Sequence, residues 1–297
     1  MIAALRPGDA IAVIAPSSPF DRKRFEDARL GVEEEGYRLV SGKNIFLGRG
    51  YLAGAESERA EDLIQAVSDP SVSAIICIRG GYGSGRLLPW LPYSMFRNKQ
   101  KIFMGYSDVT FLHLALYSQA GWTTFHGPNF VPDPPGGTGF LQGALAALRG
   151  EEEFAWDLRD AHVIRHGTSR GPLIGGNLTC LVHLLGTPFF PDPQGAILLI
   201  EDRGEALYRL DRLLTHLCLA GVLDRLGGMV LGNFDGCGDL SAIWEMVAER
   251  VRPFRFPVVA NLPFGHGCEN RVVPLGIPFH LNTRAGAFKA ERSPFQQ

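Results

Sequence analysis

Four segments of the sequence place residues that could do acyl-transfer chemistry beside short apolar runs or glycines. The first is Gly105-Tyr106-Ser107-Asp108, which follows the apolar residues 102–104 and precedes a helical pattern. A serine on such a strand-to-helix turn projects its hydroxyl at the carboxyl edge of a sheet, where amides at the helix start can face an oxyanion. Because position 109 is Val, the hydrolase pattern G-x-S-x-G is only half met, and a helix N-cap is the alternative role for Ser107.

The second segment is rich in glycine and also follows an apolar run. It reads Arg79-Gly80-Gly81-Tyr82-Gly83-Ser84-Gly85-Arg86. Its spacing fits neither G-x-G-x-x-G nor G-x-x-x-x-G-K-[ST], which argues against a dinucleotide or a P-loop site. Two interpretations remain: a turn of exposed amides that holds a phosphate, a carboxylate or an oxyanion, and a tight turn that binds nothing.

The third and fourth segments supply acids and a histidine. Glu201-Asp202-Arg203-Gly204-Glu205 ends an apolar run, where carboxylates could orient a histidine, bind a metal or favour the start of a following helix. His266 lies between Gly265 and Gly267, in a segment that cannot be regular helix. A histidine in this setting is a candidate general base, and a solvated loop histidine is the alternative.

The other histidines and the five cysteines do not suggest a metal site. The sequence holds no H-E-x-x-H and no C-x-x-C, and His113, His183 and His216 lie inside apolar helical patterns. His126 ends an expected strand, so we expect it to line the pocket. We predict that the protein needs no metal and no cofactor.

The elements that must position these segments alternate between short apolar strands and amphipathic helices, which predicts an α/β fold with a mostly parallel sheet. In the first half we expect strands at 10–15, 74–78, 102–105 and 123–125, and helices at 22–35, 56–68 and 140–148. In the second half we expect helices at 178–185, 207–220 and 240–251, and strands at 196–200 and 228–232.

Length and composition predict a globular protein with two domains. The chain has 297 residues, of which 45% are hydrophobic and 20% charged, and its net charge is -2. This charge balance argues against nucleic acid and an anionic membrane as partners, and we expect no membrane association.

A run of Pro and Gly at 131–137 suggests a boundary, so we expect domains at 1–130 and 171–297 joined by a linker region at 131–170. The N-terminus does not resemble a signal peptide, which predicts a cytoplasmic protein.

Taken in order, seven motifs resemble the LD-carboxypeptidase family of serine peptidases. They are Arg79-Gly80-Gly81-Tyr82-Gly83, Gly105-Tyr106-Ser107-Asp108, His126-Gly127-Pro128, Gly175-Gly176-Asn177-Leu178, Leu185-Gly186-Thr187, Ile200-Glu201-Asp202 with Glu205 and Tyr208-Arg209, and Pro263-Phe264-Gly265-His266. The resemblance implies a flavodoxin-like N-terminal domain with a parallel sheet and a smaller, swivelling β/α C-terminal domain. It also implies a Ser-Glu-His triad assembled across their interface.

At the matching positions the resemblance implies that Ser107 is the nucleophile, His266 the base and Glu201 the acid that orients it. Asp202 and Glu205 remain alternative acids, although alternation along a strand should point Glu201 and Asp202 to opposite faces. We expect the amides of Asp108 and Gly81 to form the oxyanion hole. The residues that we expect to contact the substrate are Arg79, Gly80, Tyr82, His126 and Arg203.

The resemblance implies a cytoplasmic homodimeric hydrolase that releases D-Ala from murein tetrapeptides during peptidoglycan recycling. One alternative is the related branch that hydrolyses peptide-nucleotide antibiotics of the microcin type. Another is a metal-independent esterase or amidase of broader scope. A fourth possibility, of a different class, is a non-catalytic two-domain protein whose glycine-rich loop binds a small anion.

Overall fold

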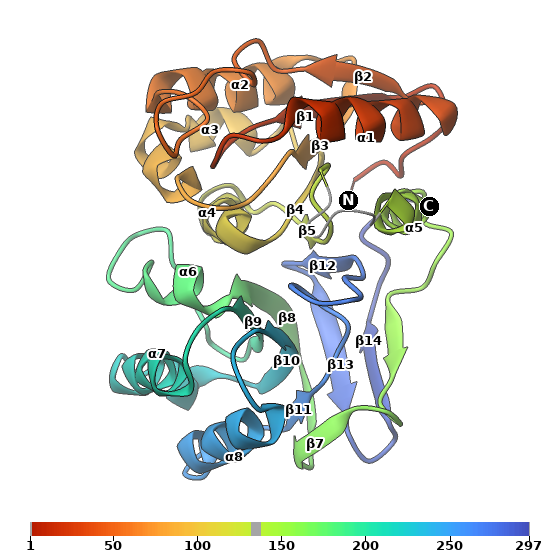
Figure 1. Ribbon diagram of the computed structural model, residues 1–297. Helices are drawn as coiled ribbons and strands as arrows, with labels where there is room; N and C mark the ends of the chain where they lie inside the picture. The colour runs from red at the N-terminus through yellow and green to blue at the C-terminus, as the bar shows by residue number, and fades with distance from the viewer. Residues whose placement is uncertain (1, 132–137, 297) are drawn as a thin grey trace.

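Two α/β units, one above the other in Figure 1, make up the protein. The computed structural model describes residues 2–131 and 138–296. The Pro- and Gly-rich stretch that we expected to mark the boundary therefore lies, from residue 132 to 137, outside the described residues. Within the described ranges, every helix is too short or too polar to cross a membrane.

The upper unit is built on a six-stranded sheet with the order β12-β5-β4-β3-β1-β2. Five of these strands are parallel, and β12 is antiparallel to β5. The strands are β1 (Ala10–Ile14), β2 (Arg38–Ser41), β3 (Val72–Cys77), β4 (Ile102–Gly105), β5 (Thr124–His126) and β12 (Val273–Leu275). The helices are α1 (Arg22–Glu34), α2 (Glu56–Ser68), α3 (Tyr93–Phe96), α4 (Thr110–Ala120) and α5 (Thr138–Leu148), with 3-10 turns η1 (Ser84–Trp90) and η2 (Ser107–Val109).

Both faces of this sheet are covered, which explains why the central strands β1 and β4 are buried along their whole length. In β1, Val13 belongs to the same core cluster as Phe25 of α1, whereas Ile14 on the opposite face belongs to the cluster with Leu63 of α2. With β12 set aside, the strand order is 2-1-3-4-5, that of a flavodoxin-like fold. In such a sheet the carboxyl ends of neighbouring strands meet at one edge, where ligands bind.

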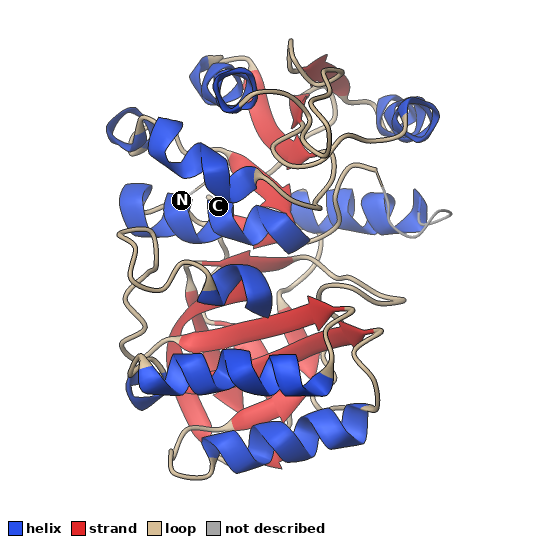
Figure 2. Ribbon diagram, turned by 60° about the vertical axis from the view of Figure 1, so that its left-hand side comes forward, coloured by secondary structure: helices blue, strands red, loops and turns tan. Residues whose placement is uncertain are grey.

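The lower unit has an eight-stranded mixed sheet with the order β6-β14-β13-β8-β9-β10-β11-β7. Its strands are β6 (Ala155–Asp157), β7 (His162–Arg165), β8 (Thr168–Asn177), β9 (Ile197–Arg203), β10 (Gly228–Asp235), β11 (Val258–Ala260), β13 (Pro278–Asn282) and β14 (Ala287–Ala290). Its helices are α6 (Leu178–Val182), α7 (Leu207–Leu219) and α8 (Leu240–Val251), with the 3-10 turn η3 (Leu223–Arg225). Figure 2 shows α7 and α8 in front of this sheet.

The expected elements differ from the structure mainly in the second half. The strand expected at 196–200 is β9, which continues to Arg203, so Glu201 and Asp202 lie inside the strand rather than after it. The helix expected at 178–185 ends at Val182. Strand β8, which contains Gly175 and Gly176, was not expected. Here they have φ of 129° and 134°, and a Cβ on Gly175 would lie 1.9 Å from the Leu199 carbonyl oxygen.

The chain crosses between the two units more than once. Residues 131–170, which we expected to form a linker, include α5, β6, β7 and the start of β8. Strand β12 returns from the C-terminal part of the chain to join the upper sheet beside β5. The two termini meet near α5 in Figure 1, where Ile2 and Phe295 form a parallel bridge.

Candidate active site

Ser107 lies on a strained turn between β4 and α4. Its φ is 67°, a left-handed conformation that residues other than Gly adopt rarely. The Asn129 side-chain oxygen accepts a hydrogen bond from the Tyr106 amide at 3.2 Å, which fixes the turn from the next strand along. The N-caps of η2 and α4 are Tyr106 and Val109, so Ser107 caps neither helix. This geometry is that of a nucleophile elbow, in which strain exposes the serine hydroxyl.

The glycine-rich loop after β3 approaches the elbow so closely that side chains would not fit. A Cβ on Gly80 would lie 2.8 Å from the Ser107 Cβ. At Gly81, whose φ is 109°, a Cβ would lie 2.4 Å from the Ser18 hydroxyl oxygen. The glycines therefore allow the loop backbone to lie against Ser107.

The two amides that we expected to form an oxyanion hole are unused by the protein itself. Gly81 and Asp108 both line the pocket beside Ser107. Neither of their amides donates a hydrogen bond to an acceptor in the described part of the chain. They can therefore donate to an oxygen of a ligand.

Glu201 and His266 form a buried pair contributed by the lower unit. Glu201 Oε2 accepts hydrogen bonds from His266 Nδ1 at 2.7 Å and from the His266 amide at 3.0 Å. Glu201 is wholly buried, and His266 is 9% exposed. Gly265 makes the contact possible, because a Cβ there would lie 2.3 Å from Glu201 Oε2. A carboxylate bound to Nδ1 leaves Nε2 as the nitrogen that can accept a proton.

Each member of this pair favours the charged form of the other. Burial opposes the charge on His266, but the charge and hydrogen bond of Glu201 outweigh it and raise the pKa of the histidine above its usual value. Burial likewise opposes the charge on Glu201, and His266 outweighs it, so the pKa of Glu201 is lowered. The pair is therefore suited to stabilise an imidazolium.

The two neighbouring acids point elsewhere. Asp202 accepts hydrogen bonds from the Asn177 side chain at 2.9 Å and from the Thr179 hydroxyl at 2.8 Å, which ties β9 to α6. Glu205 lies beyond the end of β9 and forms an ion pair with Arg209 at 3.5 Å. Among the described residues, neither acid is hydrogen-bonded or ion-paired to His266, although both line the same pocket.

A pocket of about 310 Å³ brings most of these residues together. It lies at the carboxyl edge of the upper sheet. The predicted residues that line it are Ser107, Asp108, Gly80, Gly81, Arg79, Arg203 and His266. Residues that the sequence analysis gave no role, but that also line it, are Tyr106, Asn129, Val131, Asn177, Thr179 and Cys180. Asn129 directly follows the motif His126-Gly127-Pro128, and Asn177 belongs to the motif Gly175-Gly176-Asn177-Leu178. These motifs are the sequence signal that could have found both residues.

Two residues expected to contact the substrate do not line this pocket. His126 is wholly buried, because β12 pairs with β5 and places Val273 beside it. Burial lowers the pKa of His126 to about 4, so it is neutral near pH 7. Tyr82 is 54% exposed and packs edge-on against Tyr51 with ring centres 5.6 Å apart.

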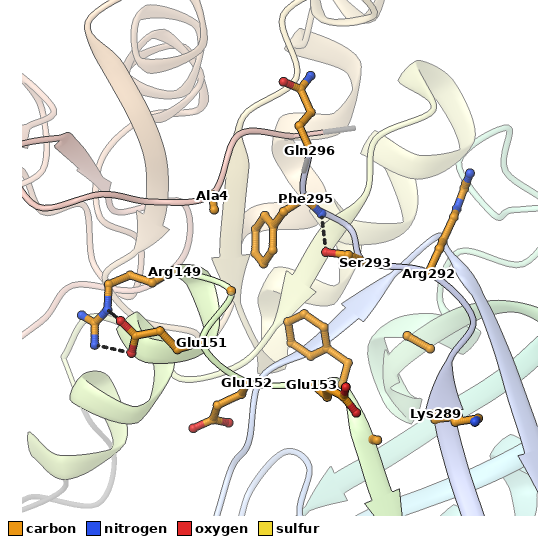
Figure 3. A pocket seen from close by; sticks show the side chains of 14 residues that line it. Ala4, Arg149, Glu151, Glu152, Glu153, Lys289, Arg292, Ser293, Phe295 and Gln296 are labelled. Carbon is orange, nitrogen blue, oxygen red and sulfur yellow. Dashed lines mark hydrogen bonds and ion pairs between the residues drawn. The ribbon is translucent and has the colours of Figure 1, made fainter.

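A larger hollow of about 600 Å³ lies away from all the predicted site residues. Figure 3 shows it between α5, β6 and the C-terminal segment, where Arg149 pairs with Glu151 and Phe295 lies beside Ala4. Among the residues that the structure describes, no group of three His, Cys, Asp or Glu side chains is placed to hold a metal ion.

Comparison with known proteins gives consistent results over the whole chain. Models of the LD-carboxypeptidase N-terminal and C-terminal domains match residues 11–127 and 170–281. A probable murein peptide carboxypeptidase of Bacillus subtilis is 35% identical over 94% of this chain and 91% of its own length. The solved muramoyltetrapeptide carboxypeptidase of Oxalobacter formigenes has a TM-score of 0.83 and 30% identity over 94% of this chain and 97% of that chain. The microcin C7 self-immunity protein MccF, known from Escherichia coli, has a TM-score of 0.90 and 26% identity over 100% of this chain and 99% of that chain.

Proposed function

This chain belongs to the LD-carboxypeptidase family of serine peptidases, and from that premise we propose that it releases a C-terminal D-amino acid, D-Ala, from murein tetrapeptides with Ser107, His266 and Glu201 as its triad. The observation that carries the proposal is the 2.7 Å contact between Glu201 and His266 Nδ1, beside a pocket that also holds the strained Ser107. The relatives named as murein peptidases support the choice of substrate.

In this proposal Ser107 Oγ attacks the carbonyl carbon of the scissile bond and its proton passes to His266 Nε2. The amides of Gly81 and Asp108 bind the oxyanion, while Glu201 stabilises the imidazolium. The C–N bond then breaks, His266 donates the proton to the leaving amine, and D-Ala departs. Water activated by His266 hydrolyses the acyl-enzyme, which frees the tripeptide and restores the Ser107 hydroxyl.

Arg79 is our candidate for the group that binds the free carboxylate of the substrate. It lines the pocket and directly precedes Gly80 and Gly81 of the glycine-rich loop. One of its N–H groups donates to the Pro19 carbonyl at 2.9 Å, and among the described residues it has no ion pair. Arg203 also lines the pocket, but it pairs with Asp235 at 3.2 Å. Arg86 and Arg271 pair with acids outside the pocket.

Paired tetrapeptides that end in D-Ala or L-Ala test this function. With the terminal carboxylate and the scissile carbonyl both held, inverting the terminal Cα misplaces the carbonyl, and a 1 Å error can cost about 100-fold in rate. We therefore expect kcat/KM to be at least about 100-fold higher for D-Ala. We expect Ser107→Ala to lower kcat by about 10⁴-fold or more while the substrate still binds. Equal rates on both peptides would refute the LD specificity, and an active Ser107→Ala variant would refute the nucleophile.

The same assay separates the murein substrate from the microcin-type alternative. A peptide-nucleotide conjugate is run beside the murein tetrapeptide, and we expect the tetrapeptide to be the better substrate. A preference for the conjugate would assign the chain to the activity named for MccF.

We further propose a cytoplasmic homodimer, as the family resemblance implies, which sedimentation at micromolar concentration and cell fractionation would test.

A further inference from the structure

A buried carboxyl group and a buried guanidinium group hold the glycine-rich loop from opposite sides. The carboxyl group is that of Asp108, which is 3% exposed and directly follows Ser107. Its Oδ2 accepts hydrogen bonds from the Ser17 hydroxyl at 2.6 Å and from the Ser84 amide at 2.8 Å. One carboxylate thus joins the loops that follow β1, β3 and β4.

The guanidinium group is that of Arg59 of α2, which is 2% exposed. Its Nε donates to the Gly54 carbonyl at 3.1 Å, and its Nη1 donates to the Gly83 carbonyl at 2.9 Å and to the Pro16 carbonyl. The Gly83–Ser84 peptide group is therefore bound at its carbonyl by Arg59 and at its amide by Asp108. This peptide group lies two residues beyond Gly81, whose amide is our candidate oxyanion donor.

Stability alone gives a weak reason for this arrangement. Taking charged groups out of water costs free energy, so replacing buried charged groups by apolar residues of similar shape is often neutral or stabilising. Fixing the Gly83–Ser84 peptide group next to the oxyanion hole has a clearer use. Oxyanion donors stabilise the transition state best when they are already held in place before the reaction.

We infer that the Asp108 side chain and Arg59 are positioning residues that fix the glycine-rich loop against Ser107 and so set the oxyanion hole. This inference rests on the proposed role of Ser107 and concerns only the side chain of Asp108, since its amide is the proposed donor. Losing a whole donor costs about 10²- to 10³-fold in kcat. Weakening its support in Asp108→Asn should cost about 10- to 100-fold in kcat and leave KM within about 3-fold.

Asp62→Asn is the matched control. Asp62 is also 3% exposed, lies in the same unit and binds the Asn44 amide and side chain at 3.1 and 3.0 Å. Both variants should lower the melting temperature, but only Asp108→Asn should lower kcat, with rates taken per titrated active site. Affinity for a peptidyl boronic acid, which adds to the serine and places an oxygen in the hole, should fall in parallel with kcat.

The opposite pattern would overturn the inference: equal kcat in the two variants, or a loss confined to KM with boronate affinity unchanged. If Asp108→Asn does not fold, Ser17→Ala keeps the carboxylate but removes one of its donors, and the same split between kcat and KM is expected at about 3- to 10-fold. If Ser107→Ala proves fully active, the proposed function fails as well. If Ser107→Ala is inactive and Asp108→Asn has normal kcat, this inference is rejected and the proposed function is retained.

Discussion

Residue chemistry at this site depends on one acid facing one histidine. Glu201 holds His266 through its charge, and the pKa of the histidine rises although burial opposes it. Because His266 must be neutral to accept the Ser107 proton, kcat/KM should fall as the pH drops through a value above about 6.5, the usual pKa of histidine.

Replacing the acid tests this coupling. In Glu201→Gln burial remains but the charge that opposes it is gone, so the pKa of His266 should drop and the acid limb of the pH profile should move to lower pH. We also expect kcat to fall by about 10⁴-fold. Asp202→Asn on the same strand is the control, since Asp202 binds Asn177 and Thr179 instead. An acid limb that stays in place in Glu201→Gln would contradict the pairing.

Arg79 gives a second test at the scale of a residue. Amidating the C-terminus of the tetrapeptide removes the carboxylate that we expect Arg79 to bind, so kcat/KM of the wild type should fall about 10- to 100-fold. In Arg79→Gln the free acid and the amide should be equally poor substrates, whereas Arg271→Gln should discriminate like the wild type. Unchanged discrimination in Arg79→Gln would move the role to Arg203.

Among the elements, the loop after β3 determines how close a backbone can come to the nucleophile. Gly80→Ala would place a methyl group 2.8 Å from the Ser107 Cβ and 3.0 Å from its hydroxyl oxygen. One of the two segments must then move, so we expect kcat to fall at least about 100-fold with only a modest change in melting temperature. Gly48→Ala is a suitable control because nothing lies within 4 Å of its Cβ position. A fully active Gly80→Ala would show that the loop is free to shift.

At the scale of the whole molecule, the site requires the upper and lower units to keep a constant separation. Ser107 belongs to the upper unit and the Glu201–His266 pair to the lower one. Thr110 of α4 joins them, because its hydroxyl oxygen accepts a hydrogen bond from the Asn177 amide at the end of β8 at 2.9 Å. Gly176 permits this approach, since a Cβ there would lie 2.5 Å from the Thr110 hydroxyl oxygen.

Thr110→Val keeps the shape of the side chain but leaves the buried Asn177 amide without its acceptor. We expect the free energy of unfolding to fall by about 1 to 3 kcal/mol, measured by urea denaturation. The rate should fall too, because His266 is no longer held opposite Ser107. Thr110→Ser retains the hydroxyl and should lose much less of both. Equal losses in the two variants would point to the methyl group instead of the hydrogen bond.

The sequence by itself determined the local elements and the order of the reactive residues. Helix 56–68, strand 102–105 and helix 240–251 match the structure at both ends, because their apolar spacing and flanking breakers act over a few residues. The apolar run before Gly105 also placed Ser107 just after a strand, and the fold class followed from alternating strands and helices. The strand end expected before Glu201 was wrong, because β9 continues to Arg203. These inferences need no knowledge of which segments meet in space.

Only the tertiary structure decided which groups face one another. Alternation along β9 predicts that Glu201 and Asp202 diverge, but the position of the Gly265 loop selects Glu201 as the partner of His266. The buried state of His126 likewise depends on β12, which arrives from far along the chain. Side-chain contacts between distant segments depend on how the sheets and loops pack against one another. The spacing of residues along the sequence does not determine how far apart such segments lie in space.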